Sequence, residues 1–197
     1  DIVIAYLLDL VLGDPQWLPH PVRFIGRFIS FLESFLRKRA KTTGGERAAG
    51  VLLALATVLV TFFALFGILR VALLINTYLF HVINIYFLYS SLAVKCLANE
   101  ALGVYRCLER GDIEGAKGRL SMLVGRDTGG LGEREIIKAV VETTSENTTD
   151  GIVSPLFYAF IGSAIGIGAP LAYAFKAVST LDSMVGYKNE KYINIGF

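Results

Sequence analysis

Three long stretches without a charged side chain divide the sequence. They run from Ala48 to Leu69 (22 residues), from Val71 to Val94 (24 residues) and from Ile152 to Phe175 (24 residues). An α-helix needs roughly 20 apolar residues to cross a hydrocarbon core of about 30 Å, so each stretch is long enough for a membrane crossing. Only Arg70 separates the first two stretches, which predicts a transmembrane helical hairpin with its turn near Arg70.

The third stretch has a different interior from the other two. Gly162, Gly166, Gly168 and Pro170 concentrate helix breakers near its middle. This pattern predicts two half-helices joined by a turn, which in a bilayer is a re-entrant segment instead of a full crossing. We therefore expect the first two stretches to span the membrane and the third to turn back.

The segments between these stretches are shorter or more polar. Ile2–Leu12 is too short to span and is followed by no cleavage-site pattern, so residues 1–22 are interpreted as the truncated end of a first membrane helix and its exit loop. Residues 23–47 form a predicted loop with seven Lys and Arg against two Glu, which the positive-inside rule places in the cytoplasm. Two crossings return residues 95–151 to the same side. Their pattern predicts three helices, near 97–109, up to about 124, and from about 133.

The composition agrees with a bilayer environment. Hydrophobic residues make up 54% of the chain and charged residues 18%, and the mean hydropathy is +0.56. The predicted fold is all-α: one membrane-embedded domain over residues 1–197, a polytopic integral membrane helical bundle with a cytoplasmic helical segment. The chain begins without Met and ends directly after a polar stretch, so we expect a piece of a longer protein, truncated at its C-terminus.

The charge of the chain argues against a nucleic-acid partner, and its cysteines and histidines argue against a zinc site or a disulfide framework. The net charge is only +2 and no basic face with interleaved aromatic residues is present, so nucleic acid is not an expected partner. Cys96 and Cys107 do not form a CxxC pair, and His20 and His81 lie far apart. A zinc site or a disulfide framework is therefore not expected.

The strongest chemical signal lies directly before the third apolar stretch. The ten residues 142–151 contain no aliphatic side chain, and Glu142, Glu146 and Asp150 are spaced i, i+4, i+8, which aligns three carboxylates on one helix face. Like charges at this spacing destabilise a helix by roughly a few tenths of a kcal/mol per pair. A cation that prefers oxygen ligands, such as Mg²⁺, would remove this repulsion. The alternative is a solvated helix end without a ligand.

A glycine-rich loop at residues 125–130 is a second candidate. Its glycines let the backbone approach a ligand, and Arg126 offers a planar fork for phosphate or carboxylate. A surface turn with an Arg126–Asp127 ion pair is the more common explanation of this pattern.

Polar residues also flank the apolar regions at both ends of the chain. Asp9 lies within the apolar first helix, where a carboxylate is costly and is by default a functional candidate. His20 lies in the proline-rich exit that follows, where a purely structural role fits equally well. The remaining candidates near the two ends are Asp14, Arg23, Asp182, Lys188, Asn189 and Glu190.

Four segments together resemble the signature blocks of the adenosylcobinamide-phosphate synthase family of cobalamin biosynthesis, the CobD/CbiB group. In chain order they are Asp9-Leu-Val-Leu-Gly-Asp-Pro with Pro19-His-Pro-Val-Arg, Met122-Leu-Val-Gly-Arg-Asp-Thr, Glu146-Asn-Thr-Thr-Asp-Gly, and Thr180-Leu-Asp-Ser-Met-Val-Gly-Tyr-Lys-Asn-Glu. Their order and spacing fit across nearly the whole chain. The family chain continues past the position matching Phe197, so the resemblance implies that further helices are absent here.

The resemblance implies an ATP-dependent ligase. Members join adenosylcobyric acid to (R)-1-aminopropan-2-yl phosphate and so form adenosylcobinamide phosphate. Such a step must activate a carboxylate, for example as an acyl phosphate, and needs Mg²⁺ and cations to neutralise charge on the phosphate. The chain has no Walker A sequence and no GxGxxG fingerprint, so the ATP site would have to be built differently.

The resemblance also suggests a role for each candidate residue. Glu146 and Asp150 would be catalytic ligands of Mg²⁺, and Asp182 would be a third ligand or a base for the incoming ammonium group. Arg126 and Lys188 would contact phosphate. The other candidates for the substrate entrance and binding surface are Asp14, His20, Arg23, Asp127, Asn147, Asn189 and Glu190.

The implied setting is the inner (cell) membrane, with a multi-pass chain and a cytoplasmic active face. The implied partners are the corrinoid and aminopropanol phosphate substrates, the lipid bilayer, and other membrane-bound enzymes of cobalamin assembly. Two other functions stay open. Asp9 within an apolar helix and the glycine-broken third stretch also suit a membrane transporter or channel, and a catalytically silent membrane sensor could share this architecture.

Overall fold

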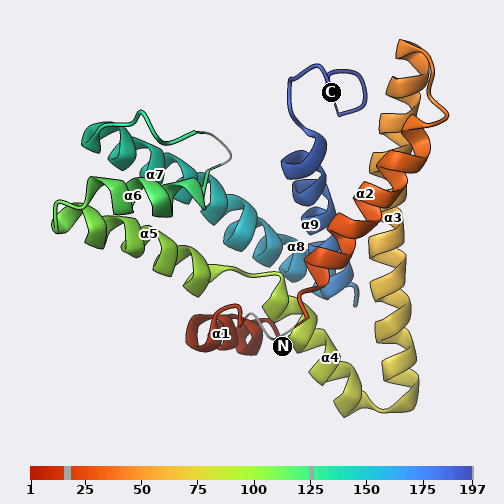
Figure 1. Cartoon of the computed structure of the whole chain (residues 1–197). Coiled ribbons are helices and arrows are strands. Elements are labelled where there is room, and N and C mark those ends of the chain that lie inside the picture. Colours follow the sequence, from red (N-terminus) through yellow and green to blue (C-terminus); the bar gives the residue numbers. More distant parts are fainter. Residues whose placement is uncertain (16–18, 125–126, 197) are drawn as a thin grey trace.

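The computed structural model describes residues 1–15, 19–124 and 127–196. Within these ranges every regular element is helical, which confirms the all-α prediction for the described chain (Figure 1). In chain order the helices are α1 (Ile2–Leu12), α2 (Pro21–Arg37), α3 (Thr43–Ile75), α4 (Thr77–Ser90), α5 (Val94–Glu109), α6 (Ile113–Ser121), α7 (Glu133–Thr148), the π-helical turn η1 (Thr149–Val153), α8 (Ser154–Ser163) and α9 (Gly168–Val185).

Helices α3 and α4 form the predicted hairpin, but its turn is at Asn76 (Figure 1). The Oδ1 atom of Asn76 accepts a hydrogen bond from the backbone N–H of Tyr78 at 2.7 Å, which caps α4. The expected turn at Arg70 is wrong. Arg70 lies inside α3, and its guanidinium carbon is 4.9 Å from the ring centroid of Phe66, one helical turn earlier.

Among the described residues, two helical stretches are long and apolar enough to cross a membrane, Thr43–Ile75 and Thr77–Glu109. The second comprises α4, a short break at residues 91–93, and α5. In their most apolar windows only 17% and 28% of the residues are buried inside the molecule. A core helix of a soluble protein would be mostly buried, so this exposure favours a lipid environment for the two stretches.

The basic segment at residues 23–47 is largely helical, so its interpretation as a loop is wrong. The His20 side chain accepts a hydrogen bond from the backbone N–H of Val22 at 3.3 Å and caps the start of α2. Along α2, Ile25 and Ile29 recur at helical spacing and are buried in the main core, beside α3 and α9. The sequence prediction missed this apolar stripe because it was based on the many positive charges of the segment.

Helices α8 and α9 form a hairpin, as predicted for residues 152–175. Gly166 adopts a positive φ of 76° in the turn, a conformation that only glycine adopts readily. A Cβ on Gly168 would lie 2.8 Å from the carbonyl oxygen of Ala159, so the close contact between the two helices requires a glycine there. Helix α9 then continues to Val185, well past the end of the apolar stretch.

Helices α5, α6 and α7 form a separate three-helix unit at the left of Figure 1. This confirms the three helices predicted between residues 95 and 151, with boundaries shifted by a few residues. The backbone N–H of Ala93 donates to the carbonyl of Gly151 at 3.1 Å and ties the start of α5 to η1. The unit has its own buried core of Val104, Ala116, Leu120, Ile136 and Ala139.

Candidate functional site

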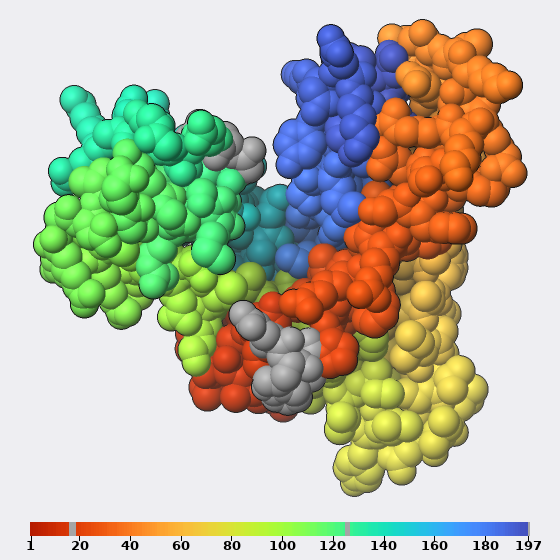
Figure 2. All heavy atoms as spheres, in the orientation of Figure 1, coloured from red at the N-terminus to blue at the C-terminus, as the bar shows by residue number. Residues whose placement is uncertain are grey.

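A pocket of about 480 Å³ lies between the end of α7, η1 and the second half of α9. The space-filling view shows the hollow between the teal α7 region and the blue α9 region (Figure 2). Its lining is half polar, which distinguishes it from the mostly apolar grooves elsewhere on the molecule. The polar side chains that line it are Glu142, Thr143, Glu146, Asn147, Asp150, Ser179, Asp182, Ser183 and Tyr187.

One wall of the pocket is the α7–η1 segment. The three acidic residues predicted to share a helix face, Glu142, Glu146 and Asp150, all line this wall, which confirms their common orientation. Asn147 donates through its side-chain amide to the carbonyl of Thr143 at 2.9 Å. Such side-chain bonds to the preceding turn compete with the backbone ladder and bend helices. The helix widens into the π-helical turn next, a feature frequent at functional sites.

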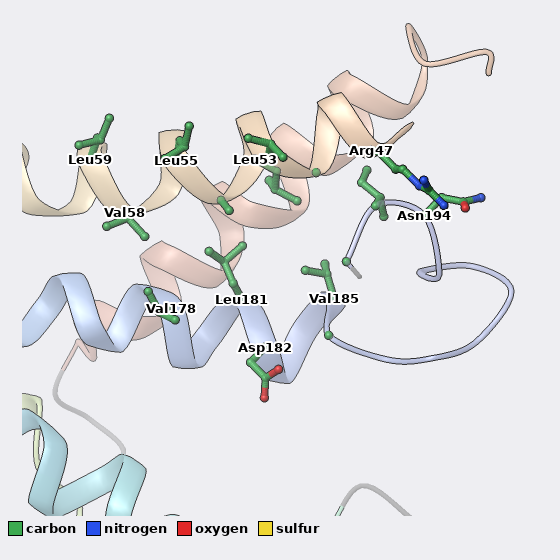
Figure 3. A pocket seen from close by; sticks show the side chains of 16 residues that line it. Arg47, Leu53, Leu55, Val58, Leu59, Val178, Leu181, Asp182, Val185 and Asn194 are labelled. Carbon is green, nitrogen blue, oxygen red and sulfur yellow. The ribbon is translucent and has the colours of Figure 1, made fainter. Parts of the chain in front are cut away.

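The opposite wall is α9. The Ser179 hydroxyl donates to Oδ2 of Asp150 at 3.3 Å and links the two walls. Asp182 lies about one helical turn further along α9 and is exposed. Figure 3 shows the neighbouring, mostly apolar pocket between α3 and α9. In this view the Asp182 carboxylate points away from α3, whereas Leu181 points toward α3. Asp182 therefore borders the pocket from the side facing α7.

The pocket offers carboxylate oxygens, the ligand type that Mg²⁺ prefers. Among the described residues, no three His, Cys, Asp or Glu side chains lie close enough together to hold a metal ion by themselves. Mg²⁺ in enzymes commonly takes one or two carboxylates and completes its shell with water and substrate phosphate. Glu146, Asp150 and Asp182 line the same pocket but do not form a complete metal site by themselves, so their role as Mg²⁺ ligands stays a prediction.

The proline-rich segment after α1 forms a second polar cluster. Nε2 of His20 lies 3.6 Å from Oδ2 of Asp14. The hydroxyls of Tyr86 and Tyr89 on α4 donate to backbone carbonyls of this segment and hold it against α4. The structure thus places Asp14 and His20 together, and their role at a substrate entrance stays a prediction.

The protonation of His20 follows from its surroundings. Burial lowers the pKa of the imidazole, and the nearby cations Lys176 and Arg23 lower this pKa further, while the Asp14 carboxylate opposes both effects. His20 is therefore neutral at neutral pH. This agrees with its side-chain nitrogen accepting a hydrogen bond at the start of α2.

Asp9, the other candidate of the N-terminal region, has a structural partner. It is buried, and its Oδ2 atom accepts a hydrogen bond from the backbone N–H of Val94 at 2.6 Å. The carboxylate thereby satisfies a free N–H group at the start of α5, which has no cap from its own preceding residue. This contact explains how a carboxylate is accommodated within an apolar helix.

Lys176 is a residue that the sequence interpretation missed. It is partly buried on α9 and lies within electrostatic range of Asp150 on one side and of His20 on the other. It directly follows the third apolar stretch, where a cation suggests only a helix boundary. The signal that could have identified it is the polar spacing of Lys176, Ser179 and Asp182 along an otherwise apolar helix.

Several predicted residues lie outside the pocket. Lys188, Asn189 and Glu190 belong to the segment after α9 and are not among the pocket-lining residues. Asp127 accepts a hydrogen bond from the backbone N–H of Gly129 at 2.9 Å in an exposed turn. Arg23 is a further such residue, exposed on α2. Arg126 lies outside the described residues. The phosphate and substrate contacts assigned to these residues stay predictions.

Fold and pocket together define a helical protein with two stretches suited to a membrane and an acidic pocket beside them. The sequence profile described as CobD/Cbib protein matches residues 2–197, so the chain belongs to the CobD/CbiB family. The resemblance of the four signature segments is thereby confirmed.

Curated relatives match nearly all of the chain. The cobalamin biosynthesis protein CobD of Clostridium tetani is 45% identical over 197 residues, which is all of this chain and 60% of the relative. CobD of Geobacter metallireducens is 47% identical over 196 residues, 100% of this chain and 59% of the relative. CbiB of Salmonella arizonae is 44% identical over 193 residues, which is 98% of this chain and 59% of the relative. The chain thus spans about three fifths of these relatives. No solved structure matches it.

Proposed function

We propose that this chain belongs to an adenosylcobinamide-phosphate synthase, which joins adenosylcobyric acid to (R)-1-aminopropan-2-yl phosphate at the expense of ATP. One observation carries the proposal: Glu146 and Asp150 from one signature segment and Asp182 from another line the same pocket. The names of the relatives, cobalamin biosynthesis proteins CobD and CbiB, support the same pathway.

The chemistry has two steps. A carboxylate oxygen of the corrinoid attacks the terminal phosphorus of ATP, ADP leaves, and an acyl phosphate forms. The amine nitrogen then attacks the acyl carbon, phosphate leaves, and the nitrogen loses a proton as the amide forms. When bound, Mg²⁺ would neutralise charge that develops on the transferred phosphate.

The residues of the pocket divide these tasks. Glu146 and Asp150 would hold the metal, and Ser179 would orient the Asp150 carboxylate through its hydrogen bond. Asp182 would serve as a further ligand or accept the proton of the substrate ammonium group, which must be neutral before it attacks. Lys176 would offset negative charge beside Asp150.

Contacts to phosphate and to the larger substrate complete the proposal. Arg126 and Lys188 would bind phosphate groups, and the Asp14–His20 pair would lie at the substrate entrance. The substrate corrinoid is large, so we propose that it approaches along the surface between this pair and α9. Lys176 lies within electrostatic range of both His20 and Asp150, which supports this path.

We also propose a multi-pass arrangement in the inner membrane. Helix α3 and the stretch that begins with α4 would cross the bilayer, the α8–α9 hairpin would re-enter it, and the acidic pocket would face the cytoplasm, where ATP is available. The lengths and exposure of the apolar stretches support the crossings. The excess of Lys and Arg at residues 23–47 supports the orientation.

Turnover by the full-length protein tests the proposal. Purified in detergent, it is expected to form adenosylcobinamide phosphate from adenosylcobyric acid, ATP, Mg²⁺ and aminopropanol phosphate. A transporter would instead require a sealed bilayer to show function. Well-folded protein that forms no amide product, yet moves a solute across vesicle membranes, would overturn the synthase proposal.

A further inference from the structure

Helix α2 has an aromatic face that the described chain leaves largely uncovered. Phe24, Phe28, Phe31 and Phe35 are spaced i, i+4, i+7, i+11, so they form one stripe beside the buried Ile25 stripe. Phe24, Phe31 and Phe35 are 60%, 67% and 43% exposed. The rings of Phe31 and Phe35 also stack, with centroids 6.4 Å apart. An aromatic stripe of this length, left open, indicates an interaction surface.

Cations border this stripe at both ends. The guanidinium carbon of Arg27 is 5.9 Å from the ring centroid of Phe24, and that of Arg39 is 3.6 Å from the centroid of Phe35. Lys38 is exposed nearby. None of the salt bridges found within the described ranges involves these three cations. Their charge is therefore available to an anionic partner.

An apolar groove of about 270 Å³ runs beside the stripe, between α2 and α3. Phe24 and Phe28 form its α2 side, and Ala64 and Leu65 belong to its α3 side. Phe24 therefore belongs to both features: its side chain lines the groove, and the guanidinium of Arg27 lies over its ring. The apolar lining of the groove suits an apolar chain, and the cations beside it suit a negative group.

We propose that this face of α2 binds anionic phospholipid. The phenylalanine stripe and the α2–α3 groove receive acyl chains, and Arg27, Lys38 and Arg39 contact the phosphate headgroups. Aromatic residues flanked by basic residues are the pattern of helices that bind anionic membrane surfaces. The complementary charge identifies the lipid class, because a neutral bilayer would satisfy the phenylalanines alone. This binding surface is separate from the acidic pocket and does not depend on the proposed ligase reaction.

Fluorescence quenching by brominated lipids tests the location of the stripe. The full chain carrying Trp17→Phe and Phe31→Trp is reconstituted in phosphatidylcholine vesicles with or without phosphatidylglycerol. The expected result is quenching of the new tryptophan by more than about half when brominated phosphatidylglycerol is present, and much weaker quenching by brominated phosphatidylcholine. The matched control is Met122→Trp in the same Trp17→Phe background, at an exposed position after α6 and outside both apolar stretches, which neither lipid should quench.

A charge variant tests the headgroup contacts. The triple change Arg27→Gln, Lys38→Gln and Arg39→Gln is expected to reduce the preference for phosphatidylglycerol by at least about 10-fold. The matched control removes three exposed cations from the three-helix unit, Arg106→Gln, Arg110→Gln and Arg134→Gln, and should leave the preference unchanged. Equal quenching by both lipids would overturn the anionic preference. Absence of quenching by either lipid would show that protein covers the stripe, and would overturn the proposal altogether.

Discussion

Lys176 lies within electrostatic range of both the carboxylate of Asp150 and the imidazole of His20. Lys176→Met is expected to lower the kcat of amide formation by about 10²-fold, because a positive charge that stabilises developing phosphate charge is removed. Lys176→Arg keeps the charge and should retain most of the kcat. Initial rates over a range of ATP concentrations measure kcat and KM separately.

The matched control for this prediction is Lys138→Met, which removes an exposed lysine from α7. It should leave both constants unchanged. A Lys176→Met protein with the kcat of the wild type would contradict a role for Lys176 in the reaction.

The depressed pKa of His20 predicts a pH effect on stability. The folded protein holds His20 neutral, whereas the unfolded chain binds a proton near pH 6.5. This contribution to stability is fully present above about pH 6.5 and is lost as the pH falls. Tm measured in detergent from about pH 7.5 to about pH 5 should fall more in the wild type than in His20→Asn, which keeps a cap acceptor but does not titrate. Equal pH dependence of the two proteins would contradict the assigned cause.

At the residue scale, the sequence predicted the acidic pocket better than its surroundings. The i, i+4, i+8 spacing was sufficient to align Glu142, Glu146 and Asp150, because side-chain direction on a helix is a local property. The proximity of Lys176 to Asp150 was not predictable, because it depends on how α9 packs beside η1. Asp9 was a candidate because a carboxylate within an apolar helix is energetically costly. Its partner, the backbone N–H of Val94, lies far away in sequence and could not be predicted from local residues.

At the element scale, the α8–α9 hairpin depends on one small residue. A methyl group on Gly168 would lie 2.4 Å from the Ser163 hydroxyl and 2.8 Å from the Ala159 carbonyl. Gly168→Ala is therefore expected to destabilise the protein by about 1–3 kcal/mol, as overpacking does. The change in Tm in detergent measures this effect.

Gly67→Ala on α3 provides the comparison for this substitution. No heavy atom lies within 4 Å of the added methyl group there, so Tm should stay constant or rise slightly. If both substitutions changed Tm equally, the close contact between α8 and α9 would not be the determinant of stability.

The boundaries of helices were predicted correctly where nearby residues, such as helix breakers or polar residues, determine them. Helix breakers identified the α8–α9 turn, and polar breaks identified the ends of α5 and α6. Arg70 was misleading, because a single arginine is compatible with a helix interior when it stacks on Phe66. The true turn required the capping side chain of Asn76, a weaker signal within an apolar run. Helix α2 was missed because its charges outweighed its apolar stripe.

At the scale of the whole molecule, the proposed topology places both walls of the acidic pocket on one side of the membrane. Cysteines introduced as Thr148→Cys and Lys188→Cys, in a Cys96→Ser and Cys107→Ser background, are expected to react with an impermeant maleimide from the cytoplasmic face only. Asn76→Cys at the α3–α4 turn should react from the opposite face. Inverted vesicles compared with intact cells separate the two faces. Labelling of positions 148 and 188 from opposite faces would exclude a shared cytoplasmic site.

The arrangement of the pocket is the part of the molecule least accessible from sequence. Each wall comes from a segment that could be recognised alone, at residues 146–151 and 180–190. Their meeting depends on the α8–α9 hairpin returning α9 beside α7, and on the contact between Ser179 and Asp150. Long-range packing of this kind leaves no periodic signature in the chain.

The most direct test of the central claim is a double-mutant cycle on the two walls of the pocket. The kcat/KM of the full-length protein is measured for Asp150→Asn, Asp182→Asn, the double variant and the exposed control Glu114→Gln. Residues that act as one unit lose activity non-additively. Each single variant is therefore expected to lose about 10²-fold or more, the double variant to lose little beyond that, and the control to stay at the wild-type value. Single variants with wild-type kcat/KM, or losses that multiply in the double variant, would contradict a shared site.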